Sequence, residues 1–135
     1  MKIKLVESIT DILDCDLIIS PYRILGKFNE ISYLFGIPKP YNIVRSIRDE
    51  TQVGSCDIIY SDGLQIANIY VEYEENGRIK ESRYGYTSSY ISLCDYIIEN
   101  NIKMIAVPYT EDELILSILD KIFNNIKINI KFYKL

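Results

Sequence analysis

The sequence predicts an α/β fold of three layers, in which helices flank a mixed, mostly parallel sheet. Two short apolar runs, 16–20 and 103–107, are typical of fully buried strands, and a Pro-Tyr pair follows each of them. The second run opens a strand–helix–strand unit, which implies a crossover over parallel neighbours. Because 135 residues with 48% hydrophobic content can bury one core, we expect a single domain over 1–135.

The second half of the chain carries the clearest helical pattern. Residues 87–100 are expected to form a helix that Thr87 or Ser88 caps. One face of this helix would be buried and would hold Tyr90, Cys94, Ile97 and Ile98. The strand over 103–107 follows, and Pro108 is expected to end it.

A second helix and a closing strand follow at once. Thr110 and Glu113 form a T-x-x-E capping box, which predicts a helix that ends at Asn124–Asn125. Its buried face is expected to hold Leu114, Ile115, Ile118, Leu119 and Ile122. Apolar and polar residues alternate over 126–133, so the chain is expected to close on a strand.

The first half of the chain also alternates strands and helices, but the sequence patterns that indicate them are weaker. A strand over 2–6 and the buried strand over 16–20, ended by Pro21, come first. The remaining expected elements are a helix from Gly26 through Phe35, a short helix over 42–48, paired strands over 56–60 and 64–73, and a polar, tyrosine-rich loop over 78–86.

Composition excludes several classes of function. The chain has no histidine, which removes Ser-His-Asp and Cys-His catalysis and histidine metal sites. A formal charge of −4 disfavours nucleic acid and anionic membrane as partners. The three cysteines lack C-x-x-C spacing, so we expect free thiols in a cytoplasmic protein with no structural zinc. No apolar run is long enough to span a bilayer, and no cofactor or metal site is expected.

The order of elements and several short strings resemble the macro domain, the fold best known for binding ADP-ribose. The similarity covers nearly the whole chain. The strings that carry it are Ile9-Thr10, 16–20, Leu25-Gly26-Lys27, 66–70, 87–90, 104–108 and 130–135. The resemblance implies a macro-domain-like sheet and a ligand derived from a nucleotide.

This sequence departs from the family at the positions expected to bind the ligand. The position of the acidic residue that binds adenine in many macro domains falls near Ser8 here, beside Glu7, and Ser20 replaces the asparagine that contacts the distal ribose. The first glycine-rich loop keeps only Gly26. The second glycine-rich loop is replaced by residues 109–113, Tyr-Thr-Glu-Asp-Glu. Its carboxylates would repel a diphosphate, and its helix cap would occupy the amides that a diphosphate needs.

The two Pro-Tyr strand ends are the candidate ligand site. Ligands of open α/β sheets bind at the carboxyl ends of parallel strands, where Ser20, Pro21 and Tyr22 would face Pro108 and Tyr109, with Thr110 next along the chain. A tyrosine offers a flat face for a base and a hydroxyl for a ribose or phosphate. The alternative is that proline only ends each strand and tyrosine covers the sheet edge.

Three further features each have a functional and a plain interpretation. Lys27 after Gly26 could hold an anion at a helix start, or it could be a solvated lysine. A basic segment rich in tyrosine, with Arg78, Lys80 and Arg83, could close over a ligand or contact a partner. The alternative is an ordinary solvent-exposed loop. The carboxylates of 111–113 could activate water, although capping explains them without catalysis.

The favoured hypothesis is a non-catalytic domain that binds ADP-ribose, another NAD-derived compound or a cyclic nucleotide, and that could sequester a signalling nucleotide. One alternative is an ADP-ribosyl or O-acyl-ADP-ribose hydrolase that uses Asp112 or a neighbouring carboxylate. Another is an interaction module that has lost the ligand and binds a protein or a second copy of itself.

Overall fold

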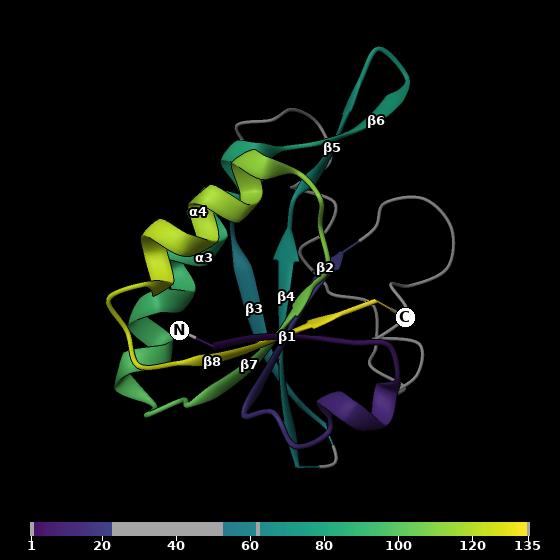
Figure 1. Ribbon diagram of the computed structural model, residues 1–135. Helices are drawn as coiled ribbons and strands as arrows, with labels where there is room; N and C mark the ends of the chain where they lie inside the picture. The colour runs from purple at the N-terminus through teal and green to yellow at the C-terminus, as the bar shows by residue number, and fades with distance from the viewer. Residues whose placement is uncertain (1, 23–52, 62, 135) are drawn as a thin grey trace.

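The computed structural model describes residues 2–22, 53–61 and 63–134. In chain order the strands and helices are β1 (Lys2–Val6), the 3-10 helix η1 (Ile9–Ile12), β2 (Leu17–Tyr22), β3 (Cys56–Ser61), β4 (Leu64–Tyr70), β5 (Glu72–Glu75), β6 (Arg78–Glu81), α3 (Arg83–Glu99), β7 (Met104–Pro108), α4 (Glu113–Phe123) and β8 (Asn129–Tyr133) (Figure 1). The predicted helix from Gly26 and the short helix over 42–48 lie outside the described residues.

In the described part of the chain, six strands form one sheet in the order β1-β8-β7-β2-β4-β3. All neighbours are parallel except β3 and β4, which form the antiparallel hairpin expected from the Ser61–Gly63 turn. The predicted α/β fold with a mixed, mostly parallel sheet is therefore confirmed.

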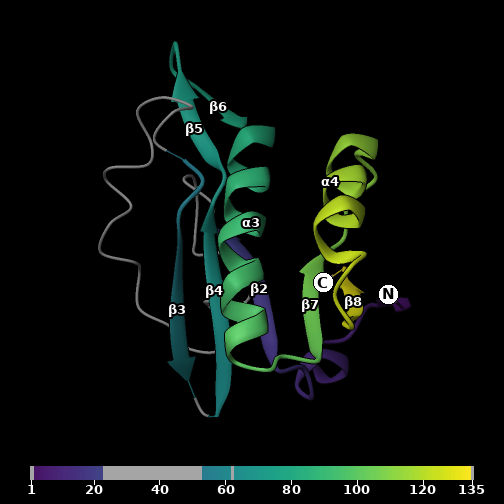
Figure 2. The same cartoon turned by 90° about the vertical axis from the view of Figure 1, so that its left-hand side faces the viewer.

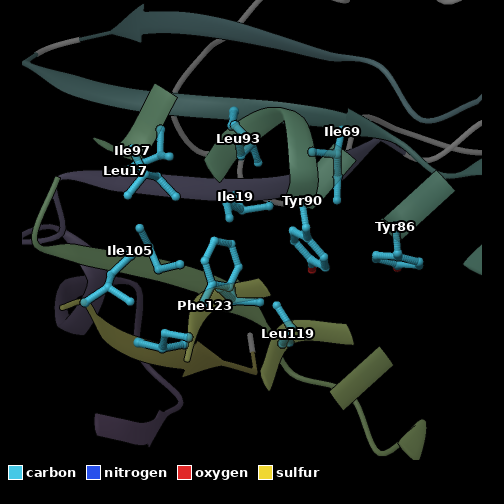
Figure 3. Close-up of a cluster of buried hydrophobic side chains, with 14 of the residues drawn as sticks. Leu17, Ile19, Ile69, Tyr86, Tyr90, Leu93, Ile97, Ile105, Leu119 and Phe123 are labelled. Atoms are coloured by element: carbon cyan, nitrogen blue, oxygen red, sulfur yellow. The ribbon is translucent and has the colours of Figure 1, made fainter. Parts of the chain in front are cut away.

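Helices α3 and α4 lie side by side over one face of the sheet (Figure 2). Alternate side chains of the central strands, including Leu17, Ile19 and Ile105, meet the buried sides of both helices in one apolar cluster. Near its centre the Tyr90 ring of α3 packs edge-on against Phe123 of α4, with ring centroids 6.0 Å apart (Figure 3). Burial of this cluster supplies the main driving force for closing the layer.

A smaller cluster lies on the opposite face of the sheet. There Ile12 of η1 packs with Ile18, Ile66 and Ala106, which project from the other side of the same strands. The side chain of Asp16 accepts hydrogen bonds from the amides of Lys103 and Met104, which fixes the start of β7 beside that of β2.

Two expected boundaries were wrong. Pro21 does not end β2, because the strand continues to Tyr22 and remains paired with β4 through Pro21↔Ile69 and Tyr22↔Tyr70. Residues 78–86 are not a loop. They form β6, which pairs with β5, and the first turn of α3, whose N-cap is Ser82 rather than Thr87 or Ser88.

The expected buried faces of the helices were partly wrong. Ile98 is exposed, and the core side of α3 instead uses Tyr86 and Leu93 together with the predicted Tyr90 and Ile97. In α4, Leu114 is exposed as well, while Ile115, Leu119 and Phe123 are buried.

The structure also bears on the expectations about the thiols and about membrane-spanning segments. All three cysteines are free, as predicted, with Cys15 buried and Cys56 and Cys94 partly buried. Neither helix of the described residues combines the length and the apolar character that crossing a membrane requires.

Candidate functional site

The sheet topology has a switch point between β2 and β7, and the place where the carboxyl ends of these strands are no longer paired is called the crevice. From β2 the chain goes on to β3 and β4 on one side of the sheet, whereas from β7 it passes through α4 to β8 on the other side. The strand order therefore reverses between β2 and β7. In open α/β sheets, such a switch point is where ligands bind.

The pairing between β2 and β7 stops well before either strand ends. It is limited to Leu17↔Ile105 and Ile18↔Ala106, although β2 continues to Tyr22 and β7 to Pro108. Among the described strands, β2 pairs beyond that point with β4 alone and β7 with β8 alone. Proline lacks the amide that a ladder needs, so Pro21 and Pro108 are tolerated where each strand is paired on one side only.

On the β2 side of the crevice, Tyr22 packs against Tyr70 of β4. Their ring centroids are 6.0 Å apart and both side chains are buried. Burial raises the pKa of Tyr22, so its hydroxyl stays neutral near pH 7. Tyr70 donates a hydrogen bond of 2.5 Å to Oδ2 of Asp57 on β3. Burial, followed by that hydrogen bond, raises the pKa of Tyr70 as well.

Below these tyrosines a row of polar side chains crosses β2, β4 and β3. Ser20 pairs with Asn68, and Asn68 pairs with Asp57, so the three side chains share one face of the sheet. Ser20 and Asn68 have no solvent exposure. Within the described residues, Ser20 Oγ and both polar atoms of the Asn68 amide have no hydrogen-bond partner. Buried polar groups are normally paired, so this row is unusual.

On the β7 side, Tyr109 is held by contacts from β8 and from its own loop. Its ring stands edge-on to Phe132 with centroids 6.5 Å apart, and the Lys134 ammonium lies 5.2 Å from the ring centroid. The Tyr109 hydroxyl donates to Glu111 Oε1 at 2.9 Å, and this hydrogen bond is the main reason why the pKa of Tyr109 is raised.

The structure thus brings the two Pro-Tyr segments to neighbouring strands at one edge of the sheet. The two rings face different neighbours, since Tyr22 contacts Tyr70 of β4 and Tyr109 contacts Phe132 of β8. Gly26 and Lys27 lie outside the described residues.

The start of α4 differs from the predicted capping box. Asp112, not Thr110, is the N-cap, and its Oδ1 accepts from the amide of Leu114 at 2.9 Å. Thr110 Oγ1 instead accepts from the amide of Asp112. The residue that precedes a helix is its cap, and the helix begins at Glu113, so Thr110 is too far upstream. Amides that could hold an anion here are already bonded to side chains of the chain itself.

Asp112 also joins the first turns of the two helices. Arg83, the first residue of α3, donates to Asp112 Oδ2 from Nε at 3.3 Å and from Nη2 at 3.2 Å. A surface hollow of about 310 Å³ lies here, lined by Glu81, Arg83, Asp112 and Ile115. The expected basic loop thus contributes one arginine to an ion pair within the chain.

Comparisons with known proteins agree on the fold. No family model matches the sequence, and no curated protein matches it either. Among solved structures, the macrodomain of Thermus aquaticus DarG matches with a TM-score of 0.69 at 10% identity, over 98% of each chain. The macrodomain of Mycobacterium tuberculosis DarG matches with a TM-score of 0.66 at 14% identity, over 98% of this chain and 97% of the other. The chain has a macrodomain-like fold.

A longer viral structure contains the same fold. The alphavirus P23pro-zbd structure matches with a TM-score of 0.66 at 14% identity, over 99% of this chain but only 22% of that one. This macrodomain-like chain therefore corresponds in fold to a small part of that viral protein.

Within the described residues, the carboxylate of Asp112 is held in its charged form. Burial acts to raise the pKa of Asp112, but hydrogen bonds from Leu114 and Arg83 outweigh it and lower the pKa. A carboxylate with a lowered pKa is a weak base. Over the residues that the structure describes, no group of three or more carboxylates and cysteines is arranged to hold a metal ion.

Sequence reasoning missed Asn68, Asp57 and Tyr70 at this site. Asn68 lies in the expected strand over 64–73, in the string 66–70 that resembles the central strand of the macro domain, and no role was predicted for its side chain. An asparagine between apolar neighbours in a strand buried on both faces was the available signal, because such a position normally takes an apolar residue.

Proposed function

We propose that this chain binds a small nucleotide-derived ligand in the crevice between β2 and β7, and that it does not chemically convert the ligand. The class includes ADP-ribose, other NAD-derived compounds and cyclic nucleotides. The macrodomain-like fold supports the class, because the family is best known for binding ADP-ribose. The observation that carries the proposal is the early end of the β2–β7 pairing at a topological switch point.

The residues at the two strand ends suit the planar and hydroxyl groups of such a ligand. Ser20, Pro21 and Tyr22 form one wall, and Pro108, Tyr109 and Thr110 form the other. Tyrosine rings offer stacking surfaces, and their neutral hydroxyls exchange hydrogen bonds with ribose hydroxyls or phosphate oxygens. From the sequence alone, Gly26 and Lys27 are proposed to bind an anionic group of the ligand.

The environment of the acidic residues after β7 supports the absence of conversion. Asp112 is engaged as a helix cap and as the partner of Arg83, while Glu111 accepts from Tyr109. A hydrolase would need one of these carboxylates free to activate water. A protein that holds a nucleotide without converting it acts by sequestering it, which suits a signalling nucleotide.

Thermal denaturation with a ligand panel tests the binding. ADP-ribose, NAD, cyclic ADP-ribose and cyclic dinucleotides would each be added at millimolar concentration. A ligand present at about 100 times its Kd stabilises the folded state by about 2.7 kcal/mol, which gives a clear rise in melting temperature. Tyr109→Ala should reduce that rise. Tyr60→Phe is the control, because Tyr60 is an exposed residue of β3 that pairs with Gln65, near the end of β4 farthest from Tyr70.

Two outcomes would overturn this proposal. Turnover of any panel compound that is lost in Asp112→Asn, with the fold retained, would favour a hydrolase. No shift with any compound, together with an oligomer in light scattering, would favour an interaction module.

A further inference from the structure

We propose that Asn68 and Ser20 form a recognition site for a planar, uncharged ligand group that presents a hydrogen-bond donor and an acceptor side by side. The edge of a nucleobase and a carboxamide both have this chemistry. The inference rests on the proposed function and extends it, because it names the group of the ligand that the protein reads and the side chains that read it.

The first step is the state of the polar atoms. Ser20 Oγ, Asn68 Nδ2 and Asn68 Oδ1 are buried, and none has a partner within the described residues. An unpaired buried polar atom costs folding free energy, whereas an apolar side chain of similar shape would not. Three such atoms on two paired residues indicate an occupant that supplies the hydrogen bonds.

The second step is the charge of the neighbours. Asp57 lies beside Asn68 in the same row, and its carboxylate accepts from Tyr70. A carboxylate at this place repels phosphate. The row therefore suits an uncharged group of the ligand rather than its phosphates.

The third step is the geometry of recognition. An asparagine amide both donates through Nδ2 and accepts through Oδ1, so it can bind a base edge or a carboxamide through two hydrogen bonds. Ser20 adds a hydroxyl that can do either. One row nearer the carboxyl edge, Tyr22 and Tyr70 place two aromatic rings on the same face, and a planar group can pack against them as it reaches the row.

Thermal denaturation of two variants tests the inference in the absence of ligand. Ser20→Ala and Asn68→Leu remove atoms that have no partner, so both should melt at the wild-type temperature or a few degrees above it. Ser89→Ala is the matched control, since Ser89 is equally buried but donates to the carbonyl of Ser55, and its loss should lower the melting temperature. If Ser20→Ala and Asn68→Leu melt lower, as the control does, the polar atoms have partners in the free protein and the inference is wrong.

Ligand fragments test the chemistry of the group. Adenosine supplies a base edge, nicotinamide a carboxamide, and ribose 5-phosphate and inorganic phosphate supply neither. We expect wild type to respond to adenosine or nicotinamide and not to the two phosphates, and which of the first pair responds identifies the group. The response should be lost in Asn68→Leu and reduced at least several-fold in Ser20→Ala. If Asn68→Leu fails to fold, Ser20→Ala alone tests the inference.

The outcomes separate this inference from the proposed function. A wild type that responds to no fragment and to no nucleotide of the panel overturns both. A wild type that responds, with both variants responding equally, overturns only the inference. A response to ribose 5-phosphate alone also overturns it, because that compound has no base edge or carboxamide.

Discussion

The hydroxyl of Tyr133 donates a hydrogen bond of 2.6 Å to the carbonyl of Ile19, across the position of β7. Ile19 is the first residue of β2 beyond its last pairing with β7. The side chain of one strand thus satisfies a backbone group at the base of the crevice that the sheet ladder leaves unpaired. This bond lets the crevice open without an orphaned buried carbonyl.

Replacement of Tyr133 by phenylalanine should destabilise the fold. The Ile19 carbonyl would then be buried without that donor, at a cost of about 1–3 kcal/mol. Urea denaturation would measure the loss as a lower midpoint. Tyr60→Phe is the control, because Tyr60 is 70% exposed and its hydroxyl contacts only the hydroxyl of Tyr96 at 3.1 Å. Equal midpoints for Tyr133→Phe and wild type would show that the bond contributes nothing.

Alkaline pH should unfold the protein through its buried tyrosines. Burial raises the pKa of Tyr90 and of Tyr70, and partial burial with the hydrogen bond between the Tyr60 and Tyr96 hydroxyls raises that of Tyr96 to about 12. Since the unfolded tyrosine pKa is about 10, these groups contribute stability that is complete below pH 10 and is lost as the pH rises above it.

Absorbance of tyrosinate at alkaline pH checks this directly, because the chain has 12 tyrosines and no tryptophan. We expect part of the tyrosinate signal to appear only with cooperative unfolding above pH 10. Tyr90→Phe should make the decline in stability with pH shallower. Full ionisation of all tyrosines in a chain that still gives a folded circular dichroism spectrum would contradict the prediction.

Most strands and the mostly parallel character of the sheet could be predicted, because burial on one or both faces of a strand produces a recognisable pattern in the sequence. The alternation from Ile126 to Tyr133 and the apolar runs at 16–20 and 103–107 each correspond to a strand. The β5–β6 hairpin was missed because its strands carry mostly exposed, charged side chains. Its signal was Asn76-Gly77, where both residues have positive φ, as a type I′ turn requires.

The candidate site was predictable only in outline. Pro21 and Pro108 indicated the approximate ends of the two strands, and both lie in the part of each strand that is no longer paired with the other. The row of Ser20, Asn68 and Asp57 could not be predicted, because it depends on the register between β2 and β4, which are far apart in the sequence, as well as on the register of the β3–β4 hairpin. A single polar residue within an apolar strand does not reveal which residues lie beside it.

Asp112 should act as a helix cap rather than as a catalytic base. Asp112→Ala removes the acceptor for the Leu114 amide and should lower the melting temperature by a few degrees, whereas asparagine caps nearly as well, so Asp112→Asn should melt close to wild type. Arg83→Ala should have a smaller effect than Asp112→Ala, because exposed ion pairs contribute little.

The contribution of Asp112 to the stability of the fold should decrease at acidic pH. The pKa of Asp112 is lowered in the folded state, so its contribution is present above the unfolded value near 3.9 and is lost as the pH falls below it. The difference in melting temperature between wild type and Asp112→Ala should therefore shrink below about pH 4. A difference that stays constant down to pH 2 would contradict a role for the charge.

Gly54 should tolerate no side chain, because it lies against the first turns of α3. Its φ is +106°, and an added Cβ would lie 2.7 Å from Cβ and 2.9 Å from Oγ of Ser88. Its amide also donates to the carbonyl of Tyr70, which ties this segment to the end of β4 beside the crevice. Gly54→Ala must therefore push α3 away from the sheet or break that hydrogen bond, in addition to straining its own backbone.

Gly77 is the matched control for this prediction. It has a similar positive φ of +75°, but no heavy atom lies within 4 Å of an added Cβ. Gly77→Ala should therefore cost only the backbone strain, about 1–2 kcal/mol, while Gly54→Ala should cost clearly more. Urea denaturation of both variants gives the comparison, and the excess of Gly54→Ala over Gly77→Ala measures the close approach of α3. Ser88→Gly combined with Gly54→Ala should recover part of that excess, because it removes the atoms that the new Cβ meets; no recovery would mean that backbone strain alone accounts for the loss.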